Sequence, residues 1–405
     1  MAGIVLLLLW FASPLAAQVK PGLLEPAVPA PEIVSLGALL MDAHTGTVLY
    51  EKNADAPIPP ASLTKLMTAH IALREVEAGR ASLNETLSPP RESWAINQPP
   101  RSSLMFLAAG QTVQLRDLLL GLAVPSGNDA AVAVALRFAP SVKEFTAMMN
   151  REAENLGLRL TRFTEPSGIS EYNMTTAREF ALFCRFYISR YPGVLKEFHS
   201  VPEFAYPKPD NVAERYREKP GTIVQQNHNR LLKDFPGTDG LKTGYIDEAG
   251  YNIALTAQRE GTRFILVLLG APAVWGGDKA RDEDGRKLLT WAFDQYRTIR
   301  PILGEPEPAQ LWKGNQREAR LVIAGEPDFT APRDRGRQLY LAAEMTDPLI
   351  APLGAGEQVG TLILSDDLGE LRRIPLLAAE DYGEGGFFRR LWDSIRLFFR
   401  KFSRR

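Results

Sequence analysis

The chain has 405 residues, of which 45% are hydrophobic and 23% are charged, and its formal net charge at pH 7 is −1. This composition is ordinary for a globular protein, and the length predicts two domains with cores that need no disulfide. A single cysteine excludes an intramolecular disulfide, and the net charge gives no indication of a nucleic-acid partner. Cys184 lies in an apolar helical pattern and is predicted to be a buried structural thiol.

The N-terminus has the pattern of a secretory signal. Residues 4–12 are apolar, and Ala16-Ala17 offers small residues for cleavage before Gln18. The apolar run is shorter than the roughly twenty residues that a membrane span needs. No Lys or Arg precedes this run, so an uncleaved anchor remains the alternative. We predict a signal peptide at residues 1–17, followed by a Pro- and Ala-rich linker at residues 18–32.

Residues 33–299 are predicted to form one α/β domain of the α+β type. Hydrophobic patterns and turn residues predict strands at 34–41, 48–52, 251–258 and 263–269. They predict helices at 62–78, 115–122, 130–138, 141–155, 176–189 and 286–296. The helix at 62–78 is apolar on more than one side, as in a helix buried on most faces. Two groups of strands around a helical centre indicate one antiparallel sheet built from both ends of the domain.

The pattern changes near Pro301, where Pro, Gly and short β-like runs dominate. These runs lie at 319–322, 338–343, 359–364 and 371–376. They predict a small all-β domain at residues 300–383.

Residues 386–405 are predicted to form an amphipathic helix. Its apolar residues form one stripe: Phe388, Leu391, Trp392, Ile395, Phe398, Phe399 and Phe402. Around the stripe lie Arg389, Arg390, Arg396, Arg400, Lys401, Arg404 and Arg405. An aromatic face beside a basic face is typical of a helix that lies in an anionic membrane surface. The alternative is a helix docked on its own protein, and the position after a Gly-rich segment at 383–386 favours the membrane.

The first chemical motif is Ser62-Leu-Thr-Lys65, whose serine and lysine project from the same face of the predicted helix. Ser62 follows Pro59-Pro60, so its N–H is not used within the helix and can point at a developing oxyanion. Lys65 on a buried helix would be desolvated, which favours a neutral amine able to act as a general base. The alternative is that Ser62 is only a helix cap and Lys65 only a solvated side chain, but this helix is too apolar to contain a lysine without a function.

Two further triplets follow, and each is weak alone. Ser126-Gly-Asn128 lies between two helices and offers a hydroxyl for proton relay and an amide for a peptide carbonyl, although helix capping explains it equally well. Lys242-Thr-Gly244 is predicted to begin a strand. Its lysine and hydroxyl can attract a substrate carboxylate, and its glycine lets a substrate backbone approach closely.

Together the triplets resemble the signature of penicillin-binding proteins and class A β-lactamases. The glycine in Ser126-Gly-Asn128 makes the chain most similar to the low-molecular-mass D-alanyl-D-alanine carboxypeptidases. Further family-like segments are Pro166-Ser-Gly168, Asn227-His-Asn229-Arg-Leu-Leu232, Thr238-Asp-Gly-Leu-Lys-Thr-Gly244 and Lys287-Leu-Leu-Thr-Trp291. The resemblance covers about residues 33 to 405. Tyr245 stands where many relatives have His, and His228 where relatives often have Arg.

The resemblance implies roles for these residues. Ser62 would be the acylated nucleophile, Lys65 its base, and Ser126 a proton relay. The substrate would be held by Asn128, Lys242, Thr243, Gly244, Tyr245 and Arg281, with the backbone N–H groups of Ser62 and Tyr245 forming the oxyanion hole. Arg281 matches the arginine that relatives place near the substrate carboxylate.

The resemblance also implies partners and a location. The substrate would be a peptidoglycan stem peptide ending in D-Ala-D-Ala, with β-lactams as covalent inhibitors and a role in cell-wall maturation and shape. The protein would be exported to the periplasmic face of the bacterial inner membrane. No cofactor is expected, and no metal, because the four histidines lack metal-ligand spacing.

Three alternatives stay open on the sequence. A β-lactamase of the same fold would use a glutamate-activated water, and Glu165 has a suitable position in the chain. The other two are a D,D-endopeptidase and a non-catalytic wall-binding protein with a degenerate site.

Overall fold

The computed structural model describes residues 25–274, 276–334, 339–367 and 369–403. The predicted signal peptide and the first part of the linker lie outside these residues. The chain divides into two compact units, one of residues 28–298 and one that contains residues 299–405.

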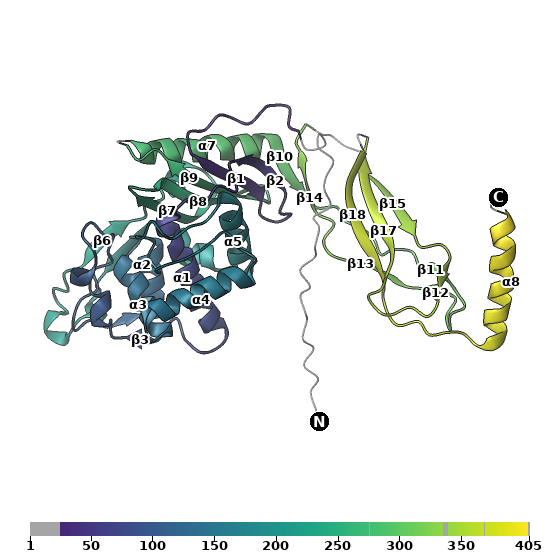
Figure 1. The fold of residues 1–405 in the computed structure, drawn as a ribbon, viewed down its shortest axis with the longest axis horizontal. Coiled ribbons are helices and arrows are strands. Elements are labelled where there is room, and N and C mark those ends of the chain that lie inside the picture. Colours follow the sequence, from purple (N-terminus) through teal and green to yellow (C-terminus); the bar gives the residue numbers. More distant parts are fainter. Residues whose placement is uncertain (1–24, 275, 335–338, 368, 404–405) are drawn as a thin grey trace, which may run out of the picture. The chain divides into compact units, whose positions relative to one another are not determined.

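The first unit is built on a five-stranded antiparallel sheet in the order β2-β1-β9-β8-β7 (Figure 1). The strands are β1 (Gly37–Asp42), β2 (Val48–Lys52), β7 (Thr238–Ile246), β8 (Gly250–Arg259) and β9 (Thr262–Ala271). Strand β1 therefore pairs with β9, although some 220 residues separate them in the chain. This order confirms the prediction of one sheet built from both ends of the domain.

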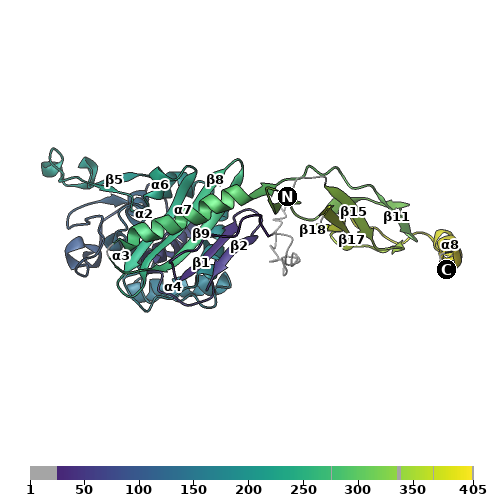
Figure 2. The same cartoon turned by 90° about the horizontal axis from the view of Figure 1, so that it is seen from above.

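Both faces of this sheet are buried, because successive side chains along a strand point to opposite faces. In β1, Leu39 and Met41 belong to the apolar core on the helical side, whereas Ala38 and Leu40 belong to the core on the other side. The long helix α7 (Gly277–Gln295) covers that second side (Figure 2). The central strands are accordingly continuous apolar runs, as expected of strands covered on both faces.

The helical side contains five of the six predicted helices. They are η1 (Ala61–Thr64), a short 3-10 turn, and α1 (Lys65–Glu77), α2 (Leu115–Ala123), α3 (Asn128–Phe138), α4 (Val142–Asn155) and α5 (Ala177–Arg190). Ser141 and Thr176 cap α4 and α5 through their side-chain oxygens, which explains why these helices begin where they do. Helix α1 is buried around most of its circumference, as predicted. Cys184 of α5 is buried, and burial raises the pKa of its thiol.

Two sequence expectations about element boundaries are wrong. The Lys-Thr-Gly motif does not begin a strand but lies in the second half of β7, because β7 already begins at Thr238. The pairing with β8 continues past a bulge at Asp239, whose side chain pairs with Arg263 of β9. Helix α7 begins at Gly277, nine residues before the predicted start, with several charged residues of its first turns buried. Its apolar pattern starts only near residue 288, so the sequence underestimates its length.

Smaller elements complete the first unit: β3 (Thr86–Leu87), β4 (Val113–Gln114), a π-helical turn η4 (Leu195–His199), β5 (Glu203–Tyr206), β6 (Ile223–Gln226), α6 (Leu231–Asp234) and β10 (Tyr296–Ile299). Short 3-10 turns lie at 91–93, 95–97, 209–211 and 214–216.

The second unit is all β before its last helix, as predicted. Its strands are β11 (Ala309–Trp312), β12 (Glu318–Ala319), β13 (Leu321–Ile323), β14 (Phe329–Pro332), β15 (Tyr340–Met345), β16 (Leu349–Ile350), β17 (Gln358–Asp366) and β18 (Gly369–Ala378). Four of them form a sheet in the order β13-β18-β17-β15, and three form a sheet in the order β12-β11-β16. The chain then forms the helix α8 (Phe387–Ser403).

Candidate active site

The site is centred on Ser62 in the 3-10 turn η1 and Lys65 at the start of α1. The Lys65 amine lies 2.9 Å from the Ser62 hydroxyl oxygen, as the i, i+3 spacing predicts. Ala61, directly before the serine, has φ 49°, and Ser126 has φ 61°. Such left-handed conformations are uncommon outside glycine and gather at functional sites. Both serines of the three motifs are thus presented by strained turns.

The Lys65 amine has three partners, and their chemistry orients it. It lies 2.8 Å from Asn128 Oδ1 and 2.6 Å from the Ser167 carbonyl oxygen, in addition to the Ser62 hydroxyl. An amide oxygen and a backbone carbonyl can only accept hydrogen bonds. A neutral amine has two hydrogens, which these two acceptors use, so its lone pair is left facing the Ser62 hydroxyl. The geometry therefore suits removal of the proton from Ser62 by Lys65.

Burial supplies the protonation state that this geometry needs. Lys65 is 1% exposed, and desolvation lowers its pKa to about 7, against the opposing attraction of Glu165 and Asp129. A substantial fraction of the amine is therefore neutral at neutral pH.

Asp129 organises the segment that faces the nucleophile. Its buried carboxylate accepts hydrogen bonds from the backbone N–H groups of Met105, Phe106, Leu107 and Ala130, at 2.8–3.0 Å. Burial raises the pKa of Asp129, although these amide bonds act against the rise. The adjacent Asn128 donates to Ser102 at 3.1 Å through its Nδ2 and accepts from Lys65 through its Oδ1, so both ends of its amide group are held.

Lys242 lies behind the open part of the site. It is 2% exposed, and its amine donates to the Thr243 carbonyl at 2.9 Å. Burial lowers its pKa well below the usual value, and the nearby Lys65 and Arg281 lower it further. Lys65 and Lys242 line one small buried cavity, together with Tyr187 and His199. His199 lies between the Tyr187 hydroxyl, 3.0 Å from its Nε2, and the Leu241 carbonyl, 3.2 Å from its Nδ1.

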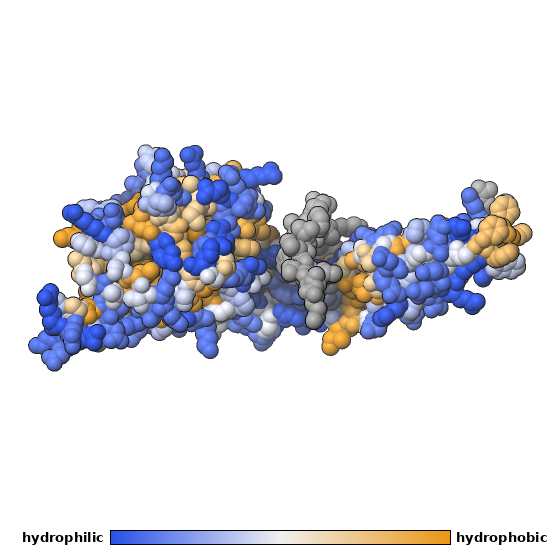
Figure 3. All heavy atoms as spheres, turned by 90° about the horizontal axis from the view of Figure 1, so that it is seen from below, coloured by the Kyte–Doolittle hydropathy of each residue, from blue (hydrophilic) through white to orange (hydrophobic). Residues whose placement is uncertain are grey.

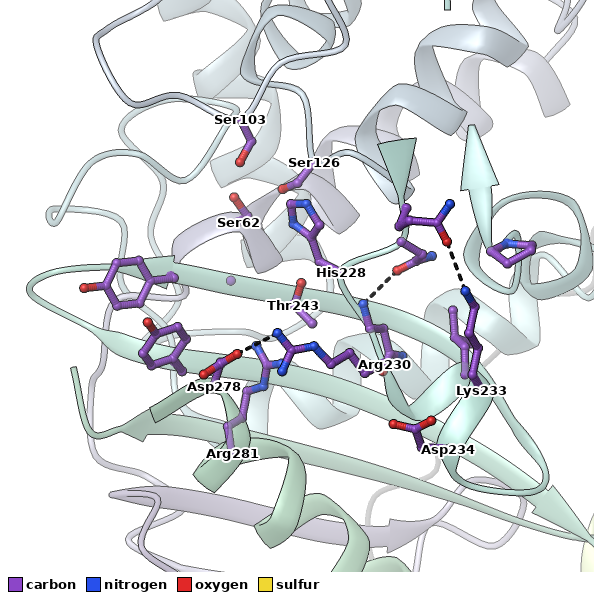
Figure 4. Close-up of a pocket in the computed structure, with 18 of the residues that line it drawn as sticks. Ser62, Ser103, Ser126, His228, Arg230, Lys233, Asp234, Thr243, Asp278 and Arg281 are labelled. Carbon is purple, nitrogen blue, oxygen red and sulfur yellow. Dashed lines mark hydrogen bonds and ion pairs between the residues drawn. The ribbon is translucent and has the colours of Figure 1, made fainter. Parts of the chain in front are cut away.

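An open cavity of about 620 Å³ adjoins Ser62 and is lined mainly by polar side chains (Figure 4). Ser62, Ser126 and His228 come together on one side of it, with Thr243 and Arg281 opposite. Desolvation lowers the pKa of His228 to about 4, with Lys242 as the next largest cause, so this side chain is neutral at pH 7. The cavity is large enough to bury a peptide end.

A second cavity of about 230 Å³ meets the first at Ser62. Its lining includes Asn128, Arg101 and the rim residues Tyr245 to Glu248. Tyr245 stacks on Tyr251 at 4.3 Å between ring centroids, and its hydroxyl donates to Asp247 at 2.6 Å. Ser62 is thus accessible from two sides, as a nucleophile that attacks within a chain must be.

The packing of β7 requires a glycine at position 244, in addition to the close approach of a substrate backbone that the sequence indicated. A Cβ atom at this position would lie 2.9 Å from both the Pro60 carbonyl oxygen and the Ser62 backbone nitrogen. The glycine therefore lets β7 pack closely against the turn that carries the nucleophile.

The structure brings together all the residues that the sequence singled out. Ser62, Ser126, Thr243, Gly244, Tyr245 and Arg281 line the larger cavity; Asn128 lines the smaller one; Lys65 and Lys242 are buried beside them. Arg281 projects from α7 and is paired with its neighbour Asp282 at 2.5 Å. In the described part of residues 28–298, no three His, Cys, Asp or Glu side chains are placed to share a metal ion.

Sequence reasoning missed several contributors. Asp129, His199 and the Ser167 carbonyl contact or support the two lysines, but the sequence assigned no role to any of them, although Ser167 lies in the family-like segment Pro166-Ser-Gly168. Asp129 directly follows Asn128 at the start of α3, but no pattern in the sequence distinguished it. A backbone carbonyl such as that of Ser167 has no sequence signal of its own.

Two family models match the chain. Residues 25–273 match a model described as D-alanyl-D-alanine carboxypeptidase, and residues 304–384 match the C-terminal domain of penicillin-binding protein 5. Among curated proteins, the chain is 34% identical to the D-alanyl-D-alanine carboxypeptidase DacC of Escherichia coli over 384 residues, which is 93% of this chain and 91% of the relative. It is 33% identical to DacA of the same organism, over 91% and 89% of the two chains.

Solved structures show the same similarity. Penicillin-binding protein 5 of Haemophilus influenzae superposes with a TM-score of 0.79 at 30% identity, over 88% of this chain and all of that one. Penicillin-binding protein D2 of Listeria monocytogenes, solved in its cefotaxime-bound form, superposes with a TM-score of 0.55 at 30% identity, over 65% of this chain and 98% of that one.

Proposed function

This chain belongs to the D-alanyl-D-alanine carboxypeptidase family of serine peptidases, the penicillin-binding proteins of low molecular mass, and from that premise we propose how it acts. It removes the terminal D-alanine of peptidoglycan stem pentapeptides through an acyl-enzyme on Ser62, and it contributes to cell-wall maturation and cell shape. The observation that carries the proposal is the buried Lys65 amine, held 2.9 Å from the Ser62 hydroxyl by two acceptors.

Acylation follows from this arrangement. Lys65 takes the Ser62 proton while the serine oxygen attacks the carbonyl carbon of the penultimate D-Ala. The resulting oxyanion is stabilised by the backbone N–H groups of Ser62 and Tyr245. Ser126 relays a proton to the departing D-Ala amine, and water then hydrolyses the ester. β-Lactams acylate the same serine and act as covalent inhibitors.

Recognition of the peptide end rests on the walls of the two cavities. Thr243 and Arg281 bind the terminal carboxylate, and the Lys242 amine is buried beneath them. Asn128 and Gly244 face the backbone of the substrate, and Tyr245 forms part of the rim. Tyr245 places a phenol ring in this rim where many relatives have the imidazole ring of His, and we expect this change to affect substrate preference more than the backbone contact.

The activity is tested by incubating the purified protein with a stem pentapeptide and measuring free D-alanine. We expect release from a peptide that ends in D-Ala-D-Ala and none from the matched peptide that ends in D-Ala-L-Ala. Failure to release D-alanine from the first peptide would refute the proposed activity.

The rate of acylation should rise with pH. Only the neutral Lys65 amine is a base, and its pKa is lowered to about 7. We therefore expect the second-order rate constant for acylation by a chromogenic cephalosporin to fall about tenfold per pH unit well below pH 7 and to level off above pH 8. A rate that is constant between pH 5 and pH 8 would exclude Lys65 as the titrating base.

We also propose that the protein is exported and attached to the periplasmic face of the inner membrane by α8. The proposed organisation is a signal peptide at 1–17, a linker at 18–32, the catalytic domain at 33–299, the β domain at 300–383 and the anchor at 386–405. Among the described residues, no helix combines the length and apolar character required to cross a bilayer. We propose attachment at the surface of the membrane, because an aromatic face beside a basic face is typical of a helix that lies in an anionic interface.

The two faces of α8 support this proposal in different ways. The apolar face is exposed to between 41% and 83% at Phe387, Phe388, Leu391, Trp392, Ile395, Phe398 and Phe399. It forms the orange patch at the C-terminal end of the chain in Figure 3. The opposite face contacts the β domain: Asp393 accepts from the Lys313 N–H at 2.8 Å, and Arg400 pairs with Asp347 at 2.8 Å.

Trp312 of the β domain lies beneath two of the arginines, with the guanidinium groups of Arg396 and Arg400 at 5.3 and 5.7 Å from its ring centre. The helix can thus be docked on its own domain and still present aromatic side chains to lipid. Docking on the protein and contact with the membrane, which the sequence analysis treated as alternatives, are therefore compatible.

Deleting residues 386–405 should release the protein from anionic vesicles while D-alanine release continues, because all the proposed site residues lie before residue 290. Replacing Phe398 and Phe399 by Ser should weaken sedimentation with vesicles at every salt concentration. Lys401→Gln should weaken it mainly at low salt, where screening is least. Arg400→Gln serves as the comparison, since Arg400 contacts the β domain and its loss should also lower the melting temperature. Unchanged sedimentation of the truncated protein would contradict the anchor.

A further inference from the structure

The side chain of Glu165 is the centre of a tightly closed loop beside the nucleophile. Its Oε2 accepts from the Ser167 N–H at 2.7 Å and from the Ser167 hydroxyl at 2.5 Å. Its Oε1 accepts from the Gly168 N–H at 2.6 Å and from Asn173 Nδ2 at 2.9 Å. A longer bond of 3.4 Å joins Oε1 to the Ser170 N–H. Donors from four residues of one loop therefore converge on one carboxylate.

This loop is attached directly to the catalytic helix. The Ser167 carbonyl accepts from the Lys65 amine at 2.6 Å, and the Pro166 carbonyl accepts from the Thr68 hydroxyl, one turn further along α1, also at 2.6 Å. Gly168 packs against the Ala61 backbone so closely that a Cβ atom would collide with the Ala61 carbonyl oxygen. Residues 166–168 thus contact the catalytic helix both before and after Ser62.

We propose that Glu165 is a positioning residue for acylation: it holds the Ser167 carbonyl against the Lys65 amine so that the lone pair faces Ser62. This inference rests on the proposed function of Ser62 and Lys65. It follows from the hydrogen-bond count at Lys65, because the amine needs two fixed acceptors to orient its lone pair, and Ser167 supplies one of them.

The same contacts argue against Glu165 as the base that activates a hydrolytic water. Both carboxylate oxygens already accept at least two hydrogen bonds from protein donors, so their lone pairs are engaged within the loop and are not directed at a hydrolytic water. Glu165 is also absent from the lining of both cavities that open at Ser62. The geometry of Glu165 therefore does not suit the role that a glutamate has in class A β-lactamases, where it activates the hydrolytic water.

The negative charge of Glu165 also acts on the Lys65 amine, and the direction of this effect follows from the groups around the amine. The groups that face Lys65 from the elements around it are Glu165, Asp129, Lys242, His228, His199 and Tyr187. Glu165 and Asp129 favour the ammonium form of Lys65 and so oppose the effect of burial. Without the charge of Glu165, less attraction counteracts the lowering of the Lys65 pKa by burial. The amine should therefore lose its proton at a lower pH. The rising part of the pH–rate profile should move in the same direction.

The test compares Glu165→Gln and Glu165→Asp with wild type in the full-length protein. The measurements are the acylation rate constant from pH 5 to pH 9, the hydrolysis rate of the acyl-enzyme and the melting temperature. Glu179→Gln is the matched control, because Glu179 also accepts a loop N–H, that of Leu160, and a hydroxyl, that of Thr161, but has no contact with Lys65.

For Glu165→Gln we expect acylation at least tenfold slower at its pH optimum and a midpoint about one pH unit lower, the size of shift that the loss of one nearby opposite charge produces. Glu165→Asp keeps the charge on a shorter side chain, so it should slow acylation with the midpoint unchanged. Glu179→Gln should change neither, even if it melts earlier. The Asp variant keeps the test informative if the Gln variant does not fold.

Three results would overturn the proposal. Normal acylation with slow hydrolysis of the acyl-enzyme in Glu165→Gln would make Glu165 a deacylation base. An unshifted midpoint in Glu165→Gln would exclude the charge effect, and normal acylation in both variants would exclude the positioning effect. Failure of the proposed function gives a separate signal, since wild type would then not be acylated or Ser62→Ala would still be labelled.

Discussion

Ser62→Ala should abolish covalent labelling by a fluorescent penicillin and release of D-alanine from a pentapeptide. The hydroxyl is the atom that forms the proposed ester, and no other serine lies within hydrogen-bonding distance of Lys65 through its side chain in the described part of the chain. Loss of a serine nucleophile that acts with a base costs on the order of 10⁶ in turnover. Any residual release of D-alanine should be the slow hydrolysis that substrate binding and the oxyanion hole support without the nucleophile.

The fold should survive this change. Ser62 contributes one hydrogen bond, to Lys65, and the loss of one such bond costs about 1 kcal/mol. Ser82→Ala is a suitable control, because Ser82-Leu-Asn84 repeats the Ser-x-Asn pattern by chance in an exposed turn. The control should be labelled like wild type. Persistent labelling of Ser62→Ala, located by mass spectrometry on another residue, would refute the assignment of the nucleophile.

Lys65→Arg should be the second most damaging substitution, with acylation reduced by at least about 10³-fold. Arginine keeps the positive charge but cannot give up its proton at any pH at which the protein is folded. The substitution therefore separates a base from a fixed charge. A rate within a few-fold of wild type would show that the charge alone suffices and that Lys65 is not the base.

A second variant is needed because a guanidinium in this buried position can disturb the fold. Lys65→Ala leaves a cavity of the size of the lost side chain and no buried charge. Added primary amines should restore part of the acylation rate in proportion to the concentration of their neutral form. Lys52→Ala is the matched control, because Lys52 also donates to a backbone carbonyl, that of Ile33. It lies in β2, at the edge of the sheet opposite to β7, and β7 is the strand that packs against the turn of Ser62. Amines should have no effect on this variant.

The sequence by itself determined the chemistry that is local in the chain. The spacing of Ser62 and Lys65 places both side chains on one helix face in any helix, so their contact followed from periodicity alone. The stripe of α8 and the strands at both ends of the first domain were equally visible, because apolar patterns with periods of 3.6 and 2 report on single elements. The Lys-Thr-Gly motif was found, but its place in the second half of β7 was not, since the bulge at Asp239 depends on pairing with β8.

Only the tertiary structure decided what surrounds the reactive groups. The acceptors that orient Lys65 come from positions 63 and 102 residues further along the chain. Its lowered pKa results from burial between elements, and Lys242 proved to lie behind the cavity rather than in its wall. The basic face of α8 likewise proved to contact Trp312 and Asp347. Desolvation and the direction of a hydrogen bond depend on atoms that packing brings together from distant segments, and no local pattern encodes them.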